Sequence, residues 1–162
     1  MIQVEIESAP IRGFPDLATL FLELADTRPV IWRRVQVSFF SKLAGLHKVI
    51  QAVFNWDDSL PHRFVLAGDI YDRVAPGEPL DAKRERNWRL DSALYPDHMF
   101  EYVYGEQPTA RIRIRLDDYS GRVVTWRYPR CVGGAGNPPP DQDKPFDLGS
   151  TNRRLWRRVK RC

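Results

Sequence analysis

The chain has 162 residues, of which 43% are hydrophobic and 28% are charged, and its formal net charge is +4. A chain of this length and composition can bury the core of a single globular domain without help from disulfides or metals. It carries no apolar run of about 18 residues, no signal-peptide pattern and only two cysteines. We therefore expect no transmembrane helix, no secretory leader, no disulfide framework and a cytoplasmic location.

The first part of the chain places one helix pattern among several strand patterns. Alternation of apolar and polar residues predicts strands at 2–6, 18–24 and 29–37. Apolar residues at helical spacing then predict the main helix at 42–54. Ser41 is placed to cap its first turn, and Asn55 tolerates the left-handed conformation of a helix end. The residues expected on the buried face of this helix are Leu46, Ile50 and Phe54.

The second part of the chain carries the patterns of strands and loops. The predicted strands lie at 63–72, 99–104, 110–116 and 122–128. Gly68-Asp69 indicates a hairpin or a bulge within the first of them, and turns are predicted at 105–108 and 117–121. Residues 76–88 and 129–149 are expected to be loops, with a short helical turn at 90–94. These elements predict an α+β fold in which a mixed, largely antiparallel sheet packs against one main helix.

The positive charge is concentrated at the end of the chain. Residues 149–162 contain no acid, and without their basic residues the chain has 19 basic and 21 acidic side chains. The sequence therefore predicts one domain at 1–148 and a basic helix or tail at 149–162. In a helix, Leu155, Trp156 and Val159 would share one side of this segment. Its basic residues are Arg153, Arg154, Arg157, Arg158, Lys160 and Arg161.

Three neighbouring motifs occupy the stretch between residues 32 and 64. They are Trp32-Arg33-Arg34, Leu46-His47 followed by Ile50-Gln51, and Trp56-Asp57-Asp58 followed by His62-x-Phe64. In this combination the chain resembles the Ri-plasmid ORF-three-like family, whose members are often described as TnpR-type passenger proteins of insertion elements. The resemblance narrows the fold and implies a mobile-element context, but it implies no reaction, because no activity is established for the family. The polar motif positions are Trp32, Arg33, Arg34, His47, Trp56, Asp57 and His62.

The two motif histidines are candidates for chemistry. The helical period places His47 near the buried face of the helix, and His62 follows after a short return, so the two rings could approach each other. This leaves open a metal or acid–base pair, since imidazole binds zinc and titrates near neutral pH. Our interpretation is a pair of partly buried histidines that tie the helix to the sheet. We expect no zinc on His47, His62 and Cys131, because the ligands are too few and polar positions of the relatives are missing.

Two sets of cations are candidates for binding phosphate. Arg111, Arg113 and Arg115 alternate with apolar residues, so a strand presents them on one face. They could hold phosphates, or pair with acids such as Glu101 on a neighbouring strand. The basic segment, with six cations and Trp156, is the stronger candidate for phosphate contacts and base stacking. The same residues also suit an acidic protein.

No arrangement typical of a known reaction stands out in the sequence. Gly133-Gly134-x-Gly136 runs into three prolines rather than into a helix, and neither the serine nor the tyrosine recombinase pattern is present. We therefore predict a non-enzymatic binding or accessory protein of mobile elements, without a cofactor or a membrane partner, which engages nucleic acid through the basic segment and the arginine-bearing strand. The alternative is a module for an acidic protein in a mobile-element or defence assembly. A recombinase-like or metal-dependent enzyme is the third possibility.

Overall fold

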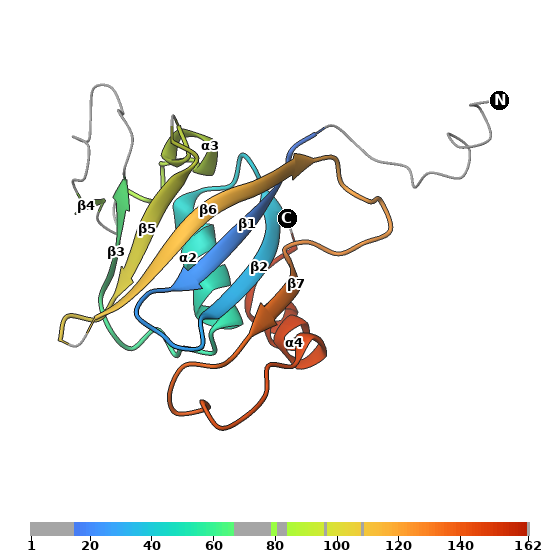
Figure 1. The fold of residues 1–162 in the computed structure, drawn as a ribbon. Coiled ribbons are helices and arrows are strands. Elements are labelled where there is room, and N and C mark those ends of the chain that lie inside the picture. Colours follow the sequence, from blue (N-terminus) through green and yellow to red (C-terminus); the bar gives the residue numbers. More distant parts are fainter. Residues whose placement is uncertain (1–14, 67–78, 81–83, 96, 108, 162) are drawn as a thin grey trace.

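In the part of the chain that the structure describes, a seven-stranded sheet and three helices make up the fold (Figure 1). The computed structural model describes residues 15–66, 79–80, 84–95, 97–107 and 109–161. Within them the strand order is β4-β3-β5-β6-β1-β2-β7, and every neighbouring pair is antiparallel. The α+β class predicted from the sequence is confirmed. The strands are β1 (Leu17–Leu24), β2 (Ile31–Ser38), β3 (His62–Leu66), β4 (Pro79–Leu80), β5 (Met99–Tyr104), β6 (Ala110–Ser120) and β7 (Arg130–Ala135). The helices are α2 (Leu43–Val53), α3 (Leu90–Ala93) and α4 (Leu148–Arg158).

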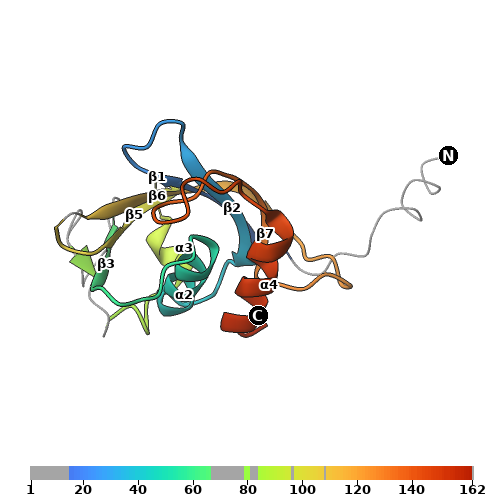
Figure 2. The same cartoon turned by 90° about the horizontal axis from the view of Figure 1, so that it is seen from below.

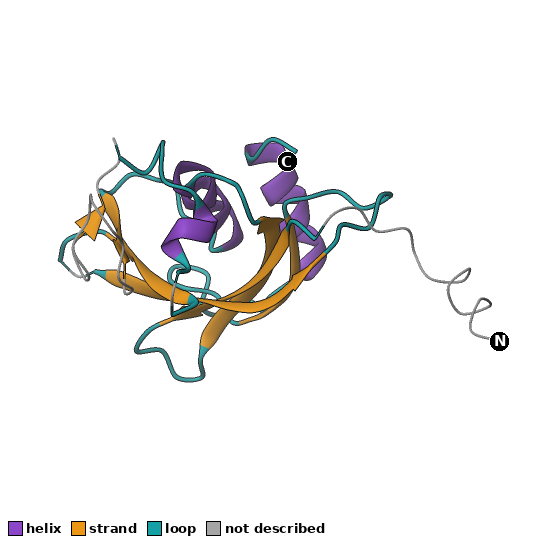
Figure 3. Cartoon of the chain, turned by 90° about the horizontal axis from the view of Figure 1, so that it is seen from above, coloured by secondary structure: helices purple, strands orange, loops and turns teal. Residues whose placement is uncertain are grey.

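The helices lie on one side of the sheet, which curves around them. Figure 2 shows α2 and α3 beneath the curved sheet and α4 beside β7, and Figure 3 shows the helices in purple on one side of the orange strands. The predicted main helix is confirmed as α2. Its predicted core residues Leu46, Ile50 and Phe54 are 1%, 0% and 2% exposed, so this helix forms one half of the hydrophobic core.

The first turn of α2 is capped differently from the prediction. Ser41 Oγ donates to the carbonyl of Ser38 at 2.7 Å, and the N-cap residue Lys42 makes no side-chain cap. The free amides of Leu43 and Ala44 donate instead to the carbonyls of Trp88 and Glu85. A distant backbone segment thus satisfies the groups that a side chain satisfies in an isolated helix. At the other end Asn55 has a φ of 56°, as predicted for a helix stop.

The strands after β5 differ most from the sequence-based prediction. β6 extends to Ser120 through the predicted turn at 117–121, and 122–128 is not a strand. The last strand is β7, which lies inside the predicted loop 129–149 and pairs with β2. Its glycines explain the error. A Cβ on Gly134 would lie 2.7 Å from the ring of Phe146, and one on Gly133 would lie 3.4 Å from the ring of Trp32, so these glycines make room for aromatic rings rather than for a turn.

α4 packs against α2 and β7. Leu155 is 0% exposed, and the indole of Trp156 donates to the carbonyl of Pro129 at 2.7 Å. The side chain of Asn152 bonds both backbone groups of Cys131: its Oδ1 accepts from the amide at 2.8 Å and its Nδ2 donates to the carbonyl at 2.9 Å. Asp147 caps the helix by accepting from the amide of Ser150.

Some sequence-based predictions fall outside the described residues. These are the strand at 2–6, the end of the strand predicted at 63–72 with its Gly68-Asp69 feature, and residues 76–78 and 81–83 of the loop predicted at 76–88. The short helical turn predicted at 90–94 is present as α3. Among the described residues, no helix has both the length and the apolar character needed to span a bilayer.

Candidate functional site

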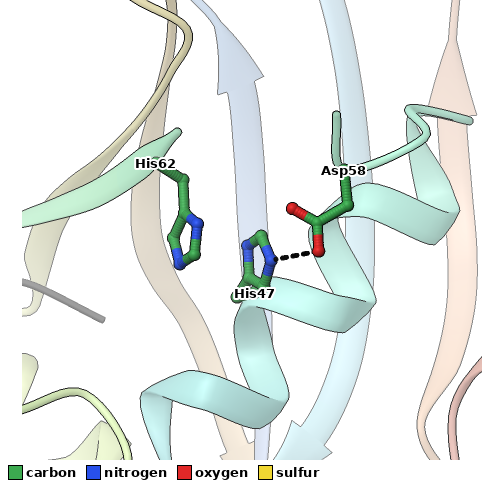
Figure 4. Close-up of side chains that lie close together, drawn as sticks. All are labelled: His47, Asp58 and His62. Carbon is green, nitrogen blue, oxygen red and sulfur yellow. Dashed lines mark ion pairs between the residues drawn. The ribbon is translucent and has the colours of Figure 1, made fainter. Parts of the chain in front are cut away.

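The structure brings the two motif histidines face to face at the edge of the core. His47 projects from the middle of α2, and His62 is the first residue of β3 (Figure 4). Their ring centroids are 3.5 Å apart and the rings are nearly parallel, at 9°. Asp58, on the return between α2 and β3, reaches the same place, with Oδ2 3.1 Å from Nε2 of His47. We call the three residues His47, Asp58 and His62 the histidine cluster.

A closed circuit of hydrogen bonds fixes one side of the histidine cluster. The amide of Asp58 donates to Oε1 of Gln51, and Nε2 of Gln51 donates to the hydroxyl of Tyr102, both at 2.8 Å. That hydroxyl lies 2.8 Å from Nδ1 of His47, whose Nε2 faces Asp58 and completes the circuit. The amide of Asp58 fixes which way the Gln51 side chain points. Tyr102 therefore donates to Nδ1, and Nε2 of the His47 ring donates to Asp58.

His62 is held from the opposite side. Its Nε2 lies 2.8 Å from Oε1 of Glu85, a residue only 3% exposed. Because a carboxylate accepts and does not donate, this contact places the ring proton on Nε2 and leaves the lone pair of Nδ1 free. Nδ1 makes no hydrogen bond to the described residues, and the buried Oε2 of Glu85 also has none. The sequence did not predict a role at this site for Glu85, Tyr102 or Gln51. The one signal present was that Gln51, already part of a motif, lies four residues after His47 on the buried face of α2.

Burial controls the charge of His47. It lowers the pKa of His47 below the ordinary imidazole value, against a smaller opposing effect from the hydrogen bond to Asp58. The contact between His47 and Asp58 is therefore a hydrogen bond from a neutral ring at neutral pH. Burial also raises the pKa of Tyr102, which keeps the phenol protonated. A neutral imidazole is the form that binds metal ions.

Arg33, the middle residue of the Trp32-Arg33-Arg34 motif, has a structural role. Arg33 is 1% exposed and lies between the rings of Phe54 and Phe146, at 5.1 and 4.4 Å. It donates to the carbonyl of Val53 and to the side chain of Asn137, both at 2.9 Å. Burial lowers its pKa to about 10.

The remaining motif positions are spread over the surface and the core. Trp32 stacks on Phe21 at 5.3 Å, on β2 and β1, and Arg34 pairs with Asp117 at 2.9 Å. Trp56 stacks between Phe54 and Tyr104. Asp57, fully exposed, accepts from Ser59, and this hydrogen bonding lowers its pKa. These contacts are those of packing and turn residues, so of the motif positions only His47 and His62 come together in the histidine cluster.

The arginine row of β6 is paired with acids. Arg111 lies 3.5 Å from Glu101, Arg113 lies 3.4 Å from Glu23, and Arg115 lies 3.2 Å from Asp117. The three arginines are half exposed, and each acid comes from the same face of the sheet. The first two contacts are the cross-strand pairing that the sequence left open as the alternative to phosphate binding, and Arg115 pairs with an acid of its own strand.

The cations of α4 and of the residues that follow it fall into two groups. Arg154 donates from Nε to the carbonyl of Ala52 in the last turn of α2 at 2.6 Å, and Arg158 donates to the carbonyl of Trp56, just after the helix, at 2.9 Å. The other four are exposed, and none of them has an acid within ion-pair distance among the described residues. We call them the open cations; they are Arg153, Arg157, Lys160 and Arg161.

Two further features lie near α4. Trp126 is 50% exposed, with the guanidinium of Arg130 4.9 Å from its ring. A groove of about 340 Å³ runs between α2 and the end of α4; Leu46 and Val49 are apolar parts of its lining, and Lys160 and Arg161 are cationic parts. Trp156, the aromatic that the sequence selected for stacking, is partly buried and hydrogen-bonded, so Trp126 is the better-placed ring.

Cys131 lies on β7 against α4, and it is 1% exposed. Its thiol donates to the carbonyl of Gly133, and burial raises its pKa. It is not part of the histidine cluster, which is the one group of potential metal ligands found among the described residues.

Comparisons with known proteins give a family and a fold. The family model described as plasmid pRiA4b ORF-3-like protein matches residues 16–145. Among solved structures, the chain is similar to MM3350 from Methanosarcina mazei Go1, a protein of unknown function, with a TM-score of 0.68 and 24% identity over 80% of this chain and 76% of that one. A search of curated proteins finds no match. At this identity the solved structure shows the fold alone.

Proposed function

We propose that this chain, which belongs to the plasmid pRiA4b ORF-3-like family, is a non-enzymatic protein that binds nucleic acid along α4. The fold by itself does not identify a reaction. The observation that carries the proposal is the set of open cations. Each is exposed, and none is neutralised by an acid among the described residues. Phosphates that replace small counterions on such a surface bind with an affinity that falls steeply with salt.

The β6 row takes a secondary place in this proposal. Arg111, Arg113 and Arg115 each have an acidic neighbour between 3.2 and 3.5 Å away. A phosphate would have to displace these contacts, and the acids would repel it. The open cations of α4 require no such exchange. This difference reduces the predicted interface from two surfaces to one.

Single strands suit the surface better than a duplex. The exposed ring of Trp126 offers a face for stacking one base. The groove beside α4 combines an apolar lining from Leu46 and Val49 with the cations Lys160 and Arg161, an arrangement that accepts an unpaired base and its phosphate. The plasmid in the family description is in keeping with a role on mobile DNA, which we include in the proposal.

Fluorescence anisotropy with labelled single-stranded DNA, duplex DNA and RNA of unrelated sequences, at several salt concentrations, tests the proposal. The variant R153Q/R157Q/K160Q/R161Q should flatten the logarithmic salt slope by roughly 0.7–0.9 per lost phosphate contact. Trp126→Ala should weaken binding to single strands in particular. R111Q/R113Q/R115Q is the matched control and should keep most of the affinity.

Two results would contradict this function. One is nucleic-acid affinity that survives the loss of all four open cations. The other is negligible affinity of the unaltered protein at physiological salt; capture of an acidic protein that is lost with the same four cations would then identify the alternative partner class. Arg154 and Arg158 stay in place in the variant, because their hydrogen bonds to the carbonyls of Ala52 and Trp56 support the fold.

A further inference from the structure

We propose that His47, Asp58 and His62 form a binding site for one divalent transition-metal ion of the zinc type. One nitrogen from each ring and one oxygen of Asp58 lie within 4.8 Å of one another. Ligands at about 2.0–2.1 Å from a tetrahedral zinc ion are separated by roughly 3.3 Å. The 3.1 Å between Nε2 of His47 and Oδ2 of Asp58 is close to this length, whereas the two parallel rings, with centroids 3.5 Å apart, must tilt away from each other for both nitrogens to point at one ion. The site goes beyond nucleic-acid binding and does not depend on it.

The hydrogen bonds around the two rings determine which ring nitrogen can bind the metal. Nδ1 of His62 has a free lone pair, because Glu85 holds the proton on Nε2. On His47 the nitrogen that binds the metal is Nε2, which faces Asp58 (Figure 4). When a metal binds there, the ring proton moves to Nδ1 and is donated to the hydroxyl oxygen of Tyr102. The hydroxyl hydrogen then turns to Gln51, whose amide group turns over to accept it and gives up its bond from the amide of Asp58. Both rings are thus held by a partner on the nitrogen away from the metal.

These outer partners are the arrangement that proteins use around metal-bound histidines. A carboxylate or another acceptor on the second ring nitrogen fixes the ring orientation and makes the first nitrogen a better ligand. Glu85 does this for His62, and Tyr102 does it for His47. A nearby cation also accounts for Glu85, whose side chain is 4% exposed and whose Oε2 has no partner among the described residues. A buried negative charge is costly unless a positive charge lies close by.

The ligand types indicate the class of metal. Two imidazoles and one carboxylate suit zinc and neighbouring first-row ions, whereas magnesium and calcium prefer oxygen ligands alone. Three protein ligands leave one position open. Asp58 is 55% exposed, so solvent reaches that position. Its φ of 56° is a left-handed conformation that aspartate tolerates. The open position takes water or an anionic ligand.

The structure offers a different set of zinc ligands from the one that the sequence suggested. That expectation counted His47, His62 and Cys131 as the available ligands. Cys131 lies elsewhere, on β7 against α4, and Asp58 takes the third place, with Glu85 supporting it from outside the ligand set. Asp58, from a turn, and Glu85, from a predicted loop, thus belong to one site.

Zinc titration of the untagged, chelator-stripped full chain against a chromogenic zinc indicator tests the site. We expect one zinc per chain, with a Kd below about 1 μM. Asp58→Asn and His62→Gln should each weaken binding at least tenfold. Glu85→Gln should weaken it by about 10–100-fold through the orientation of His62. His98→Gln is the matched control, since His98 is the third histidine of the chain, is exposed and lies outside the cluster; it should bind zinc as the unaltered chain does.

Cobalt gives a second readout that a merely structural role would not affect. Cobalt(II) bound to the unaltered chain should show the intense visible absorption of a four-coordinate centre, and Asp58→Asn should lose it. Because the side chain of Asp58 is more than half exposed, this variant is expected to fold, which circular dichroism checks. The proposal is overturned if the unaltered chain binds no zinc, or if Asp58→Asn and His62→Gln bind it as tightly as His98→Gln.

Discussion

Nε of Arg33 on β2 donates to the carbonyl of Val53, the last residue of α2, at 2.9 Å. This bond joins the sheet to the end of the main helix. The guanidinium has aromatic rings on either side and no acid partner among the described residues. Its position is therefore maintained by hydrogen bonds to neutral oxygens and by packing.

Arg33→Lys should destabilise the fold by about 1.5–3 kcal/mol. Lysine keeps the charge, but it cannot serve Val53 and Asn137 at once with a planar group. Urea unfolding measures the change. Arg34→Lys on the exposed side of the same strand is the comparison, and it should stay within about 0.5 kcal/mol. Equal effects of the two substitutions would show that the buried position is not special.

Leu46→Ala should cost about 2–5 kcal/mol, because its side chain is 1% exposed in the core between α2 and the sheet. Leu60→Ala removes the same atoms from a residue that is 48% exposed and should cost far less. Thermal and urea unfolding of both variants measure the difference. A loss for Leu46→Ala within experimental error would place this residue outside the core.

Two glycine substitutions should have opposite signs. Gly134→Ala places a methyl group 2.7 Å from the ring of Phe146 and should destabilise the protein by about 1–3 kcal/mol. A Cβ at Gly45, inside α2, meets nothing within 4 Å, so Gly45→Ala should stabilise by up to about 1 kcal/mol. The free energy of unfolding decides both. Stabilisation by Gly134→Ala would mean that Phe146 moves away without cost.

Cys131 should make the protein less stable at alkaline pH. Burial raises the pKa of its thiol in the folded state, so above the ordinary thiol pKa of about 8.5 the unfolded chain loses this proton first. The unfolded state then binds fewer protons than the folded state, and stability falls as pH rises. Urea unfolding between about pH 7.5 and 9.5 measures the slope. In Cys131→Ala this contribution should be gone; an unchanged slope would assign the alkaline loss to other groups.

Local periodicity was enough to predict the central elements. The helical spacing of Leu46, Ile50 and Phe54 predicted α2, and alternation predicted β1, β2, β5 and most of β6. Such patterns arise because each element buries one face. They also predicted that His47 and His62 could approach each other, since only a short return separates the helix from the next strand.

Distant contacts explain what the sequence did not predict. β7 has the glycines of a loop, and it is a strand because β2 supplies its hydrogen bonds and because Trp32 and Phe146 occupy the space where side chains would stand. Glu85 meets His62 from a segment 23 residues away, and no local pattern marks that contact. The cap of α2 likewise comes from the backbone of Glu85 and Trp88 rather than from Ser41.

The hydrogen bonds between Asn152 and Cys131 also affect whether a strand of another chain can pair with the edge of the sheet. β7 is an edge strand, and edge strands expose backbone donors and acceptors that invite a strand from another chain. The amide side chain of Asn152 takes both backbone groups of Cys131, and the indole of Trp156 takes the carbonyl of Pro129 just before the strand. A second chain therefore finds these groups occupied at this edge. Strand addition and edge-to-edge aggregation are therefore disfavoured there. Other molecules that approach this edge meet the outer face of α4 instead.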